Sequence, residues 1–350
     1  MTRRKRKIYT TAKVAFILAL VARAQAFLAF PQAEAQDKPV PVTIDNFTRA
    51  ETDHYFRKRV ELGCFGQFCH DREPTPIDRQ PIIRMNRDTP YSAAIFDLTT
   101  PVTIVKPDTK GRFQSILVIN EDHYLQRVIY EPGTYTFTRE EMGTRYIQMT
   151  VRTFVNPNDP KDIAELHKAQ DGLKVTQASR GNFEVPNWDQ AQLDGLRKAI
   201  LTMTPWVPDS KYMFGRKDEV REVRHLLGTA GGYGGNREQD AIYLSVVPQR
   251  NDGTTPHTLT VRDVPVDGFW SVIVYNKDGF FEAPANTISV NNVTAKPNTD
   301  GTTTIHFGGN PDAPNYLRIM PGWSYMVRLY RPRPEILDGT WKFPEAQPLK

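Results

Sequence analysis

The stretch "SILVINEDHYLQ", residues 115–126, starts as an apolar segment and continues into five consecutive polar side chains. Residues 115–119 are mostly aliphatic and β-branched, which is typical of a buried strand. The polar residues 120–124 then have two interpretations. They are either a catalytic or metal-binding cluster, or the turn at which a strand leaves the core.

The pleat of a strand divides these polar side chains between its two sides. If the strand continues, Asn120, Asp122 and Tyr124 lie on one side. Glu121 and His123 lie on the other side, where a metal site would need a third ligand that no diagnostic spacing supplies. We therefore expect at most half of the cluster to serve one site, and we choose Asn120, Asp122 and Tyr124 as candidate binding residues.

Short strands surround this stretch in the sequence. In the first half of the chain they cover residues 91–98, 101–107, 112–120, 127–138 and 145–155, with Pro, Gly and Asp between them. The last third is a second run of short strands, broken by "DG", "NTDG" and "PG" turns, which is typical of a sandwich or jelly roll. We predict a mainly β fold with helical connections, a β-rich α+β class, built from two packed β-sandwich or jelly-roll-like domains.

Helical patterns precede and separate the two β regions. A helix and a cysteine-containing loop fill residues 36–79, and the N-terminal β domain covers residues 80–185. Residues 186–240 are expected to be a helical linker with the glycine-rich loop "GGYGGN". Residues 241–350 are the C-terminal β domain, and we expect its proline-rich tail to lie along the surface.

The N-terminus has the organisation of a secretory signal peptide, residues 1–35. Residues 2–7 are basic, residues 14–22 are apolar, and small-residue cleavage patterns end at Ala26 and at Ala35. The apolar run is short for a membrane span, although an uncleaved anchor is the alternative. Cleavage after Ala35 leaves 38 basic and 39 acidic residues, so the net charge of +5 belongs to the targeting segment. We expect a periplasmic or secreted protein with no nucleic-acid partner and no membrane span after signal cleavage.

Two cysteines, Cys64 and Cys69, occur in the sequence "GCFGQFCHDR". In an oxidising compartment a local disulfide is the expected state, and Gly66 lets the chain turn between the two residues. The C-x4-C-H spacing differs from the C-x-x-C-H of haem attachment. We predict a Cys64–Cys69 disulfide, no metal site and no cofactor.

Several longer motifs are distributed along the chain. They are "HDR" (70–72), "MNRDTPYSAAIFDL" (85–98), "PGTYT" (132–136), "NDGTT" (251–255), "VPVDGFWSVIVYNKDGFF" (264–281), "HFGG" (306–309) and "PGWSYMVRLYRPRPEILDGTWKFP" (321–344). With these motifs the chain resembles the bacterial exported family that pairs two domains of unknown function, DUF 1254 on the N-terminal side and DUF 1214 on the C-terminal side. The resemblance covers residues 60–345 and implies a two-domain, mainly β protein with helical connections. It implies no particular reaction.

The resemblance also singles out candidate site residues. The H-x-R piece of the family pattern corresponds to His70 and Arg72. The N-x-D-T-x-Y-S piece corresponds to Asn86, Asp88, Thr89, Tyr91 and Ser92. The aromatic-glycine loop of the family is present as "GGYGGN", with Tyr233 where tryptophan is commoner. These residues are candidates for binding, but Asn and Asp before a strand are also typical of a simple Asx-turn.

Two functions fit these residues. In the first, an exported, soluble protein binds a small molecule or an envelope-derived ligand in an interdomain cleft, which is lined by His70, Arg72, Asn86, Asp88 and Tyr91. In the second, the same cleft belongs to a periplasmic hydrolase or lyase with His70 or Asp88 as the base of an acid–base pair. The sequence has no G-x-S-x-G nucleophile motif and no metal signature, which favours the first function. A homo-oligomer is compatible with both.

Overall fold

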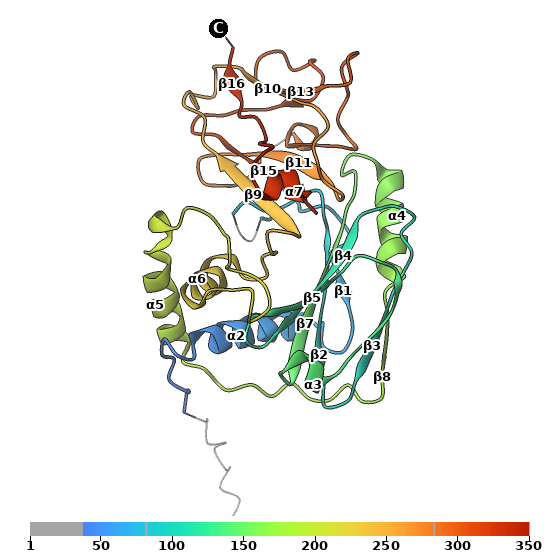
Figure 1. Ribbon diagram of the computed structural model, residues 1–350, viewed down its shortest axis with the longest axis vertical. Coiled ribbons are helices and arrows are strands. Elements are labelled where there is room, and N and C mark those ends of the chain that lie inside the picture. The colour runs from blue at the N-terminus through green and yellow to red at the C-terminus, as the bar shows by residue number, and fades with distance from the viewer. Residues whose placement is uncertain (1–37, 81–82, 283, 350) are drawn as a thin grey trace, which may run out of the picture. The chain divides into compact units, whose positions relative to one another are not determined.

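The two strand-rich parts of the chain each fold into a pair of facing sheets (Figure 1). The computed structural model describes residues 38–80, 83–282 and 284–349. Residues from Pro41 onward belong to one unit, and residues 38–40 belong to a separate one. The predicted signal peptide, with its cleavage sites near Ala26 and Ala35, lies outside the described residues.

A five-stranded sheet and a three-stranded sheet form the N-terminal sandwich. The first has the strand order β1-β2-β7-β4-β5 and the second the order β6-β3-β8. The strands are β1 Cys69–His70, β2 Tyr91–Asp97, β3 Val102–Lys106, β4 Gln114–Asn120, β5 Leu125–Ile129, β6 Gly133–Phe137, β7 Tyr146–Thr153 and β8 Lys174–Gln177. Phe96, Ile104 and Val118 are buried in one apolar cluster that both sheets share. This shared core holds the two sheets face to face.

The single strand that we predicted over residues 127–138 is in fact two strands in two different sheets. β5 ends at Ile129 and pairs with β4, whereas β6 starts at Gly133 and pairs with β3. Pro132 between them has no N–H to donate to a ladder, so the first strand cannot continue through it. The chain therefore passes from one sheet to the other at this proline.

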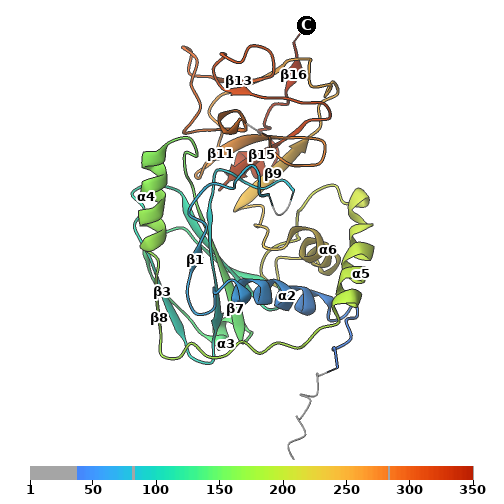
Figure 2. The same ribbon diagram turned by 180° about the vertical axis from the view of Figure 1, so that it is seen from behind.

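A helical layer lies beside the five-stranded sheet, and its first helix packs on the second face of that sheet (Figure 2). It contains α2 Phe47–Glu61, α5 Gln190–Leu201 and α6 Glu222–Gly232. The three helices share an apolar cluster that includes Phe47, Leu193 and Leu227. Phe56 of α2 packs with Ile95 of β2. The segment that we expected to be a linker is therefore part of the N-terminal body, because its helices bury their apolar faces against α2. The remaining helices are α3 Arg139–Met142, α4 Pro160–Asp171, α7 Pro334–Leu337 and the 3-10 turns η1 Thr204–Trp206 and η2 Ala285–Thr287.

Two four-stranded sheets form the C-terminal sandwich. Their strand orders are β14-β13-β10-β16 and β12-β11-β15-β9. The strands are β9 Ala241–Val246, β10 His257–Val261, β11 Trp270–Tyr275, β12 Ser289–Asn291, β13 Thr303–Phe307, β14 Tyr316–Leu317, β15 Ser324–Tyr330 and β16 Gln347–Pro348. Trp323 and Tyr325 are buried in the shared core. The tail that we expected on the surface also places Phe343 in this core, since an aromatic ring gains more from burial than from exposure. The predicted mainly β fold with helical connections is confirmed.

Two further findings concern the cysteines and the membrane. The predicted disulfide between Cys64 and Cys69 is confirmed, with the two Cα atoms 5.2 Å apart. Within the described part of the chain, every helix is too short or too polar to cross a membrane.

Candidate functional site

The N-x-D-T-x-Y-S segment joins the two halves of the chain. Asn86 Nδ2 donates a hydrogen bond to the Tyr330 hydroxyl at 3.1 Å. Asp88 Oδ1 accepts hydrogen bonds from Ser289 Oγ at 3.2 Å and from Asn291 Nδ2 at 2.9 Å. These partners belong to β12 and β15 of the C-terminal sandwich. We call this contact the joint.

Asp88 is fully buried in the joint. Burial raises the pKa of its carboxyl group, and the hydrogen bond from Asn291 opposes this shift. Its second oxygen, Oδ2, has no hydrogen-bond partner among the described residues. Because the carboxyl group has no exposed surface, a substrate could reach it only if the joint opened. The contacts of Asp88 are those of an anchor between two sheets.

A buried arginine strengthens the joint from the C-terminal side. Arg328 Nη2 donates to the backbone oxygens of Arg84 at 2.7 Å and Met85 at 3.3 Å. The same nitrogen lies 2.8 Å from the hydroxyl of Tyr275, which itself donates to the backbone oxygen of Met85 at 2.7 Å. A buried network of this kind fixes the groups that it connects. The segment before β2 is therefore held firmly on the C-terminal sheet.

His70 and Arg72 make their contacts within the N-terminal half. His70 Nδ1 lies 2.7 Å from Ser92 Oγ in β2, and burial lowers the pKa of the imidazole. Arg72 Nη2 donates to Asp171 Oδ1 in α4 at 2.5 Å. Among the described residues, no hydrogen bond connects His70 or Arg72 with Asp88. The structure thus does not join these three side chains in one acid–base arrangement.

Thr89 and Tyr91, the other candidates in this motif, lie next to the joint. Thr89 Oγ1 accepts a hydrogen bond from Asn86 Nδ2 at 2.9 Å, within the buried segment. The Tyr91 ring lies below the guanidinium of Arg152, with 5.5 Å between its centroid and Cζ. Both side chains therefore take part in packing next to the joint.

The polar run after β4 folds into a tight turn. Asn120 Oδ1 accepts from the backbone nitrogens of Asp122 at 3.1 Å and Tyr124 at 3.0 Å. His123 adopts a left-handed φ of 60°, so the pleat stops at Asn120 and the predicted division into two sides does not apply. The Asp122 carboxylate pairs with Arg49 of α2, whose Nη2 lies 2.6 Å from Oδ1. The turn is tied to the helical layer by this ion pair.

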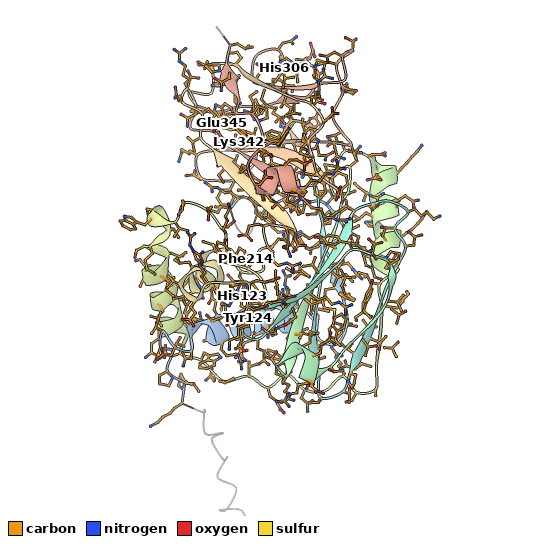
Figure 3. The ribbon with its side chains drawn as sticks, in the orientation of Figure 1. His123, Tyr124, Phe214, His306, Lys342 and Glu345 are labelled. Carbon is orange, nitrogen blue, oxygen red and sulfur yellow. A yellow bond between two sulfur atoms is a disulfide. The ribbon has the colours of Figure 1, made fainter. Side chains whose placement is uncertain are left out.

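Stacked aromatic rings connect this turn with the helical layer, and Figure 3 labels His123 and Tyr124 of the turn. Tyr233 of the glycine-rich loop stacks on Tyr55 with 4.1 Å between ring centroids and on His123 with 4.6 Å. His225 of α6 stacks on His123 at 5.5 Å and on Tyr124 at 4.7 Å. Of the two candidate binding residues, Tyr233 is therefore stacked by two protein rings and Tyr124 by one.

His123 is fully buried and both of its ring nitrogens are occupied. Nε2 accepts the backbone N–H of Gly234 at 3.0 Å. Nδ1 lies 2.8 Å from Thr229 Oγ1, whose own hydrogen is donated to the backbone oxygen of His225. The proton of the neutral ring is therefore on Nδ1. Burial lowers the pKa of His123 well below the ordinary histidine value, which keeps the ring neutral.

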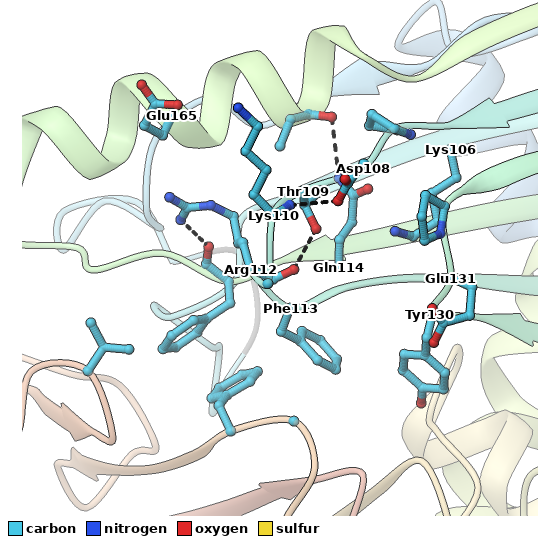
Figure 4. Close-up of a pocket in the computed structure, with 18 of the residues that line it drawn as sticks. Lys106, Asp108, Thr109, Lys110, Arg112, Phe113, Gln114, Tyr130, Glu131 and Glu165 are labelled. Carbon is cyan, nitrogen blue, oxygen red and sulfur yellow. Dashed lines mark hydrogen bonds between the residues drawn. The ribbon is translucent and has the colours of Figure 1, made fainter.

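A pocket of about 780 Å³ opens between the two halves of the chain (Figure 4). Its N-terminal walls are the loop from Lys106 to Gln114, the connection between β5 and β6, and one side of α4. Its C-terminal walls are residues 267–269, residues 292–293 and Arg331. We call this cavity the interdomain pocket. None of the candidate residues predicted from the sequence lines it.

Aromatic rings form one wall of the interdomain pocket. Phe269 stacks on Phe154 with 4.2 Å between centroids and meets Phe113 edge-on at 5.2 Å. Tyr130 lies next to Phe113, and the guanidinium of Arg331 covers its ring at 4.6 Å. Phe269 is 1% exposed and Phe154 6%, so the surface of this wall that a bound molecule can contact belongs mainly to the half-buried Phe113 and Tyr130.

Several charged side chains of the interdomain pocket are paired. Arg112 Nη1 lies 3.0 Å from Asp162 Oδ2, and Lys168 Nζ lies 2.6 Å from Glu165 Oε1. Asp267 pairs with an arginine outside the pocket at 2.7 Å. The lining charges that lack such an ion pair among the described residues are Lys106, Lys110, Arg331, Asp108 and Glu131. These side chains determine which charge the pocket prefers.

Lys106 is the unusual member of this set because it is buried, with 2% of its surface exposed. Its Nζ makes no hydrogen bond or ion pair to any described residue. Burial lowers the pKa of the ammonium group, and the nearby carboxylates of Glu131 and Asp108 oppose this shift. Gln114, at the other end of the same loop, is equally buried, and its Oε1 has no hydrogen-bond partner in the described chain.

The sequence contained a signal for Lys106 that we did not use. In β3 the side chains of Val102, Ile104 and Lys106 follow a period of two and are all buried. A lysine in register with two core residues must either reach solvent or face an interior cavity. No comparable signal exists for Phe269 or Arg331, because their place in the pocket depends on contacts between the two halves.

Comparisons with known proteins agree with the resemblance seen in the motifs. Residues 65–134 match the protein family of unknown function DUF1254, and residues 247–334 match the protein family of unknown function DUF1214. The chain therefore has the predicted pairing in the predicted order. A search of curated proteins found no match to this chain.

Two solved structures have a similar fold. One is the VPA0106 protein from Vibrio parahaemolyticus, with a TM-score of 0.67 and 17% sequence identity, over 88% of this chain and 98% of that chain. The other is an uncharacterized protein from Burkholderia cenocepacia, with a TM-score of 0.50 and 14% identity, over 97% of this chain and 96% of that chain. At these identities the likeness concerns the fold alone.

Proposed function

We propose that this chain, which pairs a DUF1254 region with a DUF1214 region, binds a small molecule in the interdomain pocket. The observation that carries the proposal is a cavity of about 780 Å³ with walls from both halves of the chain. Ligand pockets typically have volumes of about 300–1,000 Å³, and this one combines aromatic rings with many charged side chains. The joint supports the proposal further, because it fixes the relative position of the two walls before a ligand arrives.

The proposal places this binding activity outside the cytoplasm. The Cys64–Cys69 disulfide supports an oxidising compartment, and the sequence of residues 1–35 supports export. A periplasmic or secreted protein meets small molecules that enter from the medium or derive from the cell envelope. The ligand is therefore expected to be a molecule of this origin.

A titration with N-phenyl-1-naphthylamine, a neutral apolar dye, tests the proposal, because its fluorescence rises when it enters an apolar site. Val293 lines the pocket and is 56% exposed, so the Val293→Trp substitution places a large ring in the pocket without disturbing the core. Val247 is 65% exposed and does not line the pocket, so Val247→Trp is the matched control.

We expect saturable one-to-one binding by the natural protein and by the Val247→Trp variant. The Val293→Trp variant should bind roughly tenfold more weakly, because its added ring occupies the space of the dye. Absence of saturable binding to the natural protein, or equal weakening in both variants, would contradict the proposal. Circular dichroism of both variants checks that the fold is unchanged.

A further inference from the structure

We propose that the ligand of the interdomain pocket is a small organic anion with an apolar body, and that its charged group binds Lys106. This inference rests on the proposed function and adds the chemical class of the ligand. Three observations support this inference. Lys106 is available to a ligand, the other cations of the pocket are already engaged or exposed, and aromatic side chains lie nearby.

Lys106 is available because no described residue forms a hydrogen bond or an ion pair with its ammonium group, and the carboxylates of Glu131 and Asp108 act on it only from beyond ion-pair distance. A buried ammonium is costly unless an anion or a hydrogen-bond acceptor compensates it. The Lys106 side chain is 2% exposed, lines the pocket, and has no hydrogen bond or ion pair to a described residue. An anionic group that enters the pocket would supply the missing partner. The bond would be charge-assisted and poorly screened by solvent.

The other cations of the pocket are less suited to this role. Arg112 and Lys168 already hold carboxylates of α4. Arg331 covers the Tyr130 ring, and Lys110 is exposed, so water and salt screen its charge. A bound anion would therefore stabilise Lys106 more than any other cation that lines the pocket.

The apolar body of the ligand is inferred from the wall beside this loop. Phe113, adjacent to Gln114 in the chain, lines the pocket and is half-buried, and the buried Phe269 from the opposite half supports its ring edge-on. A purely polar anion such as inorganic phosphate would leave the aromatic wall unused.

Two dyes that differ by one charged group test the inference. The first is 1-anilinonaphthalene-8-sulfonate, an aromatic anion, and the second is N-phenyl-1-naphthylamine, which has the same rings and N–H but no sulfonate. The substitution Lys106→Met removes the buried charge and keeps an apolar side chain of similar length. Lys110→Met removes an exposed charge from the same pocket and is the matched control.

We expect Lys106→Met to weaken binding of the sulfonate roughly tenfold to hundredfold, the range for a charge-assisted hydrogen bond, and to change binding of the neutral dye by less than about twofold. Lys110→Met should change both by less than about twofold. The neutral dye also reports whether the Lys106→Met variant still has a folded pocket.

The outcomes separate the two proposals. If neither dye binds the natural protein, the proposed function itself fails. If the neutral dye binds but the sulfonate is insensitive to Lys106→Met, the pocket exists and the inference about an anion at Lys106 is overturned. The inference would also be overturned if the Lys106 and Lys110 variants lost sulfonate binding equally. Non-specific attraction of the sulfonate to positive charge at the pocket mouth would then explain why the pocket binds it.

Discussion

The substitution Asp53→Asn should remove a pH dependence of stability that one buried carboxyl group creates. Asp53 lies in α2, is 1% exposed, and accepts a hydrogen bond from Trp188 Nε1 at 2.8 Å through Oδ2. Its Oδ1 has no hydrogen-bond partner among the described residues. Burial raises the pKa of Asp53 to about 7, and the neighbouring charge of Glu121 adds to this shift. The folded protein therefore holds a proton that the unfolded chain releases.

The size of the effect follows from the two pKa values. An aspartate in an unfolded chain has a pKa of about 3.9, so the difference of about three units corresponds to roughly 4 kcal/mol. Between about pH 4 and pH 7 the folded state binds more protons than the unfolded state. The free energy of unfolding must therefore fall as the pH rises through this window. An asparagine cannot titrate, and its amide oxygen can still accept the Trp188 hydrogen bond.

Urea denaturation at pH 4.5 and at pH 8 measures this contribution. The difference in unfolding free energy between the natural protein and the Asp53→Asn variant should change by about 3 kcal/mol between the two pH values, because an unfolded aspartate is already mostly ionised at pH 4.5. The matched control is Asp45→Asn, because Asp45 is exposed just before the same helix. The unfolding free energy of this variant should differ from that of the natural protein by an amount that is nearly constant with pH. If the Asp53→Asn variant keeps the pH slope of the natural protein, the assignment of this proton to Asp53 is wrong.

Three further predictions concern the pocket, an ion pair and the disulfide. Burial lowers the pKa of Lys106, so affinity for the sulfonate dye should fall as the pH rises, starting below the ordinary lysine pKa of about 10.4, and should be flat over the same range in Lys106→Met. Arg197 Nε lies 2.6 Å from Oε1 of the buried Glu51. Arg197→Met should therefore lower the free energy of unfolding, measured by urea denaturation, by about 3 kcal/mol, and adding Glu51→Gln should restore part of this free energy. Replacing Cys64 and Cys69 by serine should lower the unfolding free energy by about 2 kcal/mol, and a reducing agent should then have no further effect.

Local patterns in the sequence were sufficient for most of the strands and for the disulfide, because each depends on neighbouring residues. The period of two in β3 could also have placed Lys106 among core residues, but we did not use it, and it could not reveal a cavity there. The role of His123 was beyond such patterns. Its two ring nitrogens bond to Thr229 and Gly234, which are more than a hundred residues away in the chain. Hydrogen bonds between distant segments depend on the whole topology, so no local spacing predicts them.

The N-x-D-T-x-Y-S motif identified important residues but did not reveal their role. The resemblance pointed to Asn86 and Asp88, but position in a motif does not distinguish a binding residue from an anchor. Their partners Tyr330, Ser289 and Asn291 follow 201 to 244 residues later in the sequence. Only the pairing of the two sandwiches brings these side chains together.

The joint and the interdomain pocket are physically connected through one side chain. The Tyr330 hydroxyl accepts the hydrogen bond from Asn86, and its ring stacks on Phe269 in the pocket wall with 4.3 Å between centroids. Arg331, the next residue, lines the pocket directly. A change that loosens the joint should therefore displace the aromatic wall as well, since the Tyr330 ring supports Phe269 from behind the pocket lining. The pocket takes its lining from both matched regions, because Lys106 and Phe113 belong to the DUF1254 region and Phe269 and Arg331 belong to the DUF1214 region.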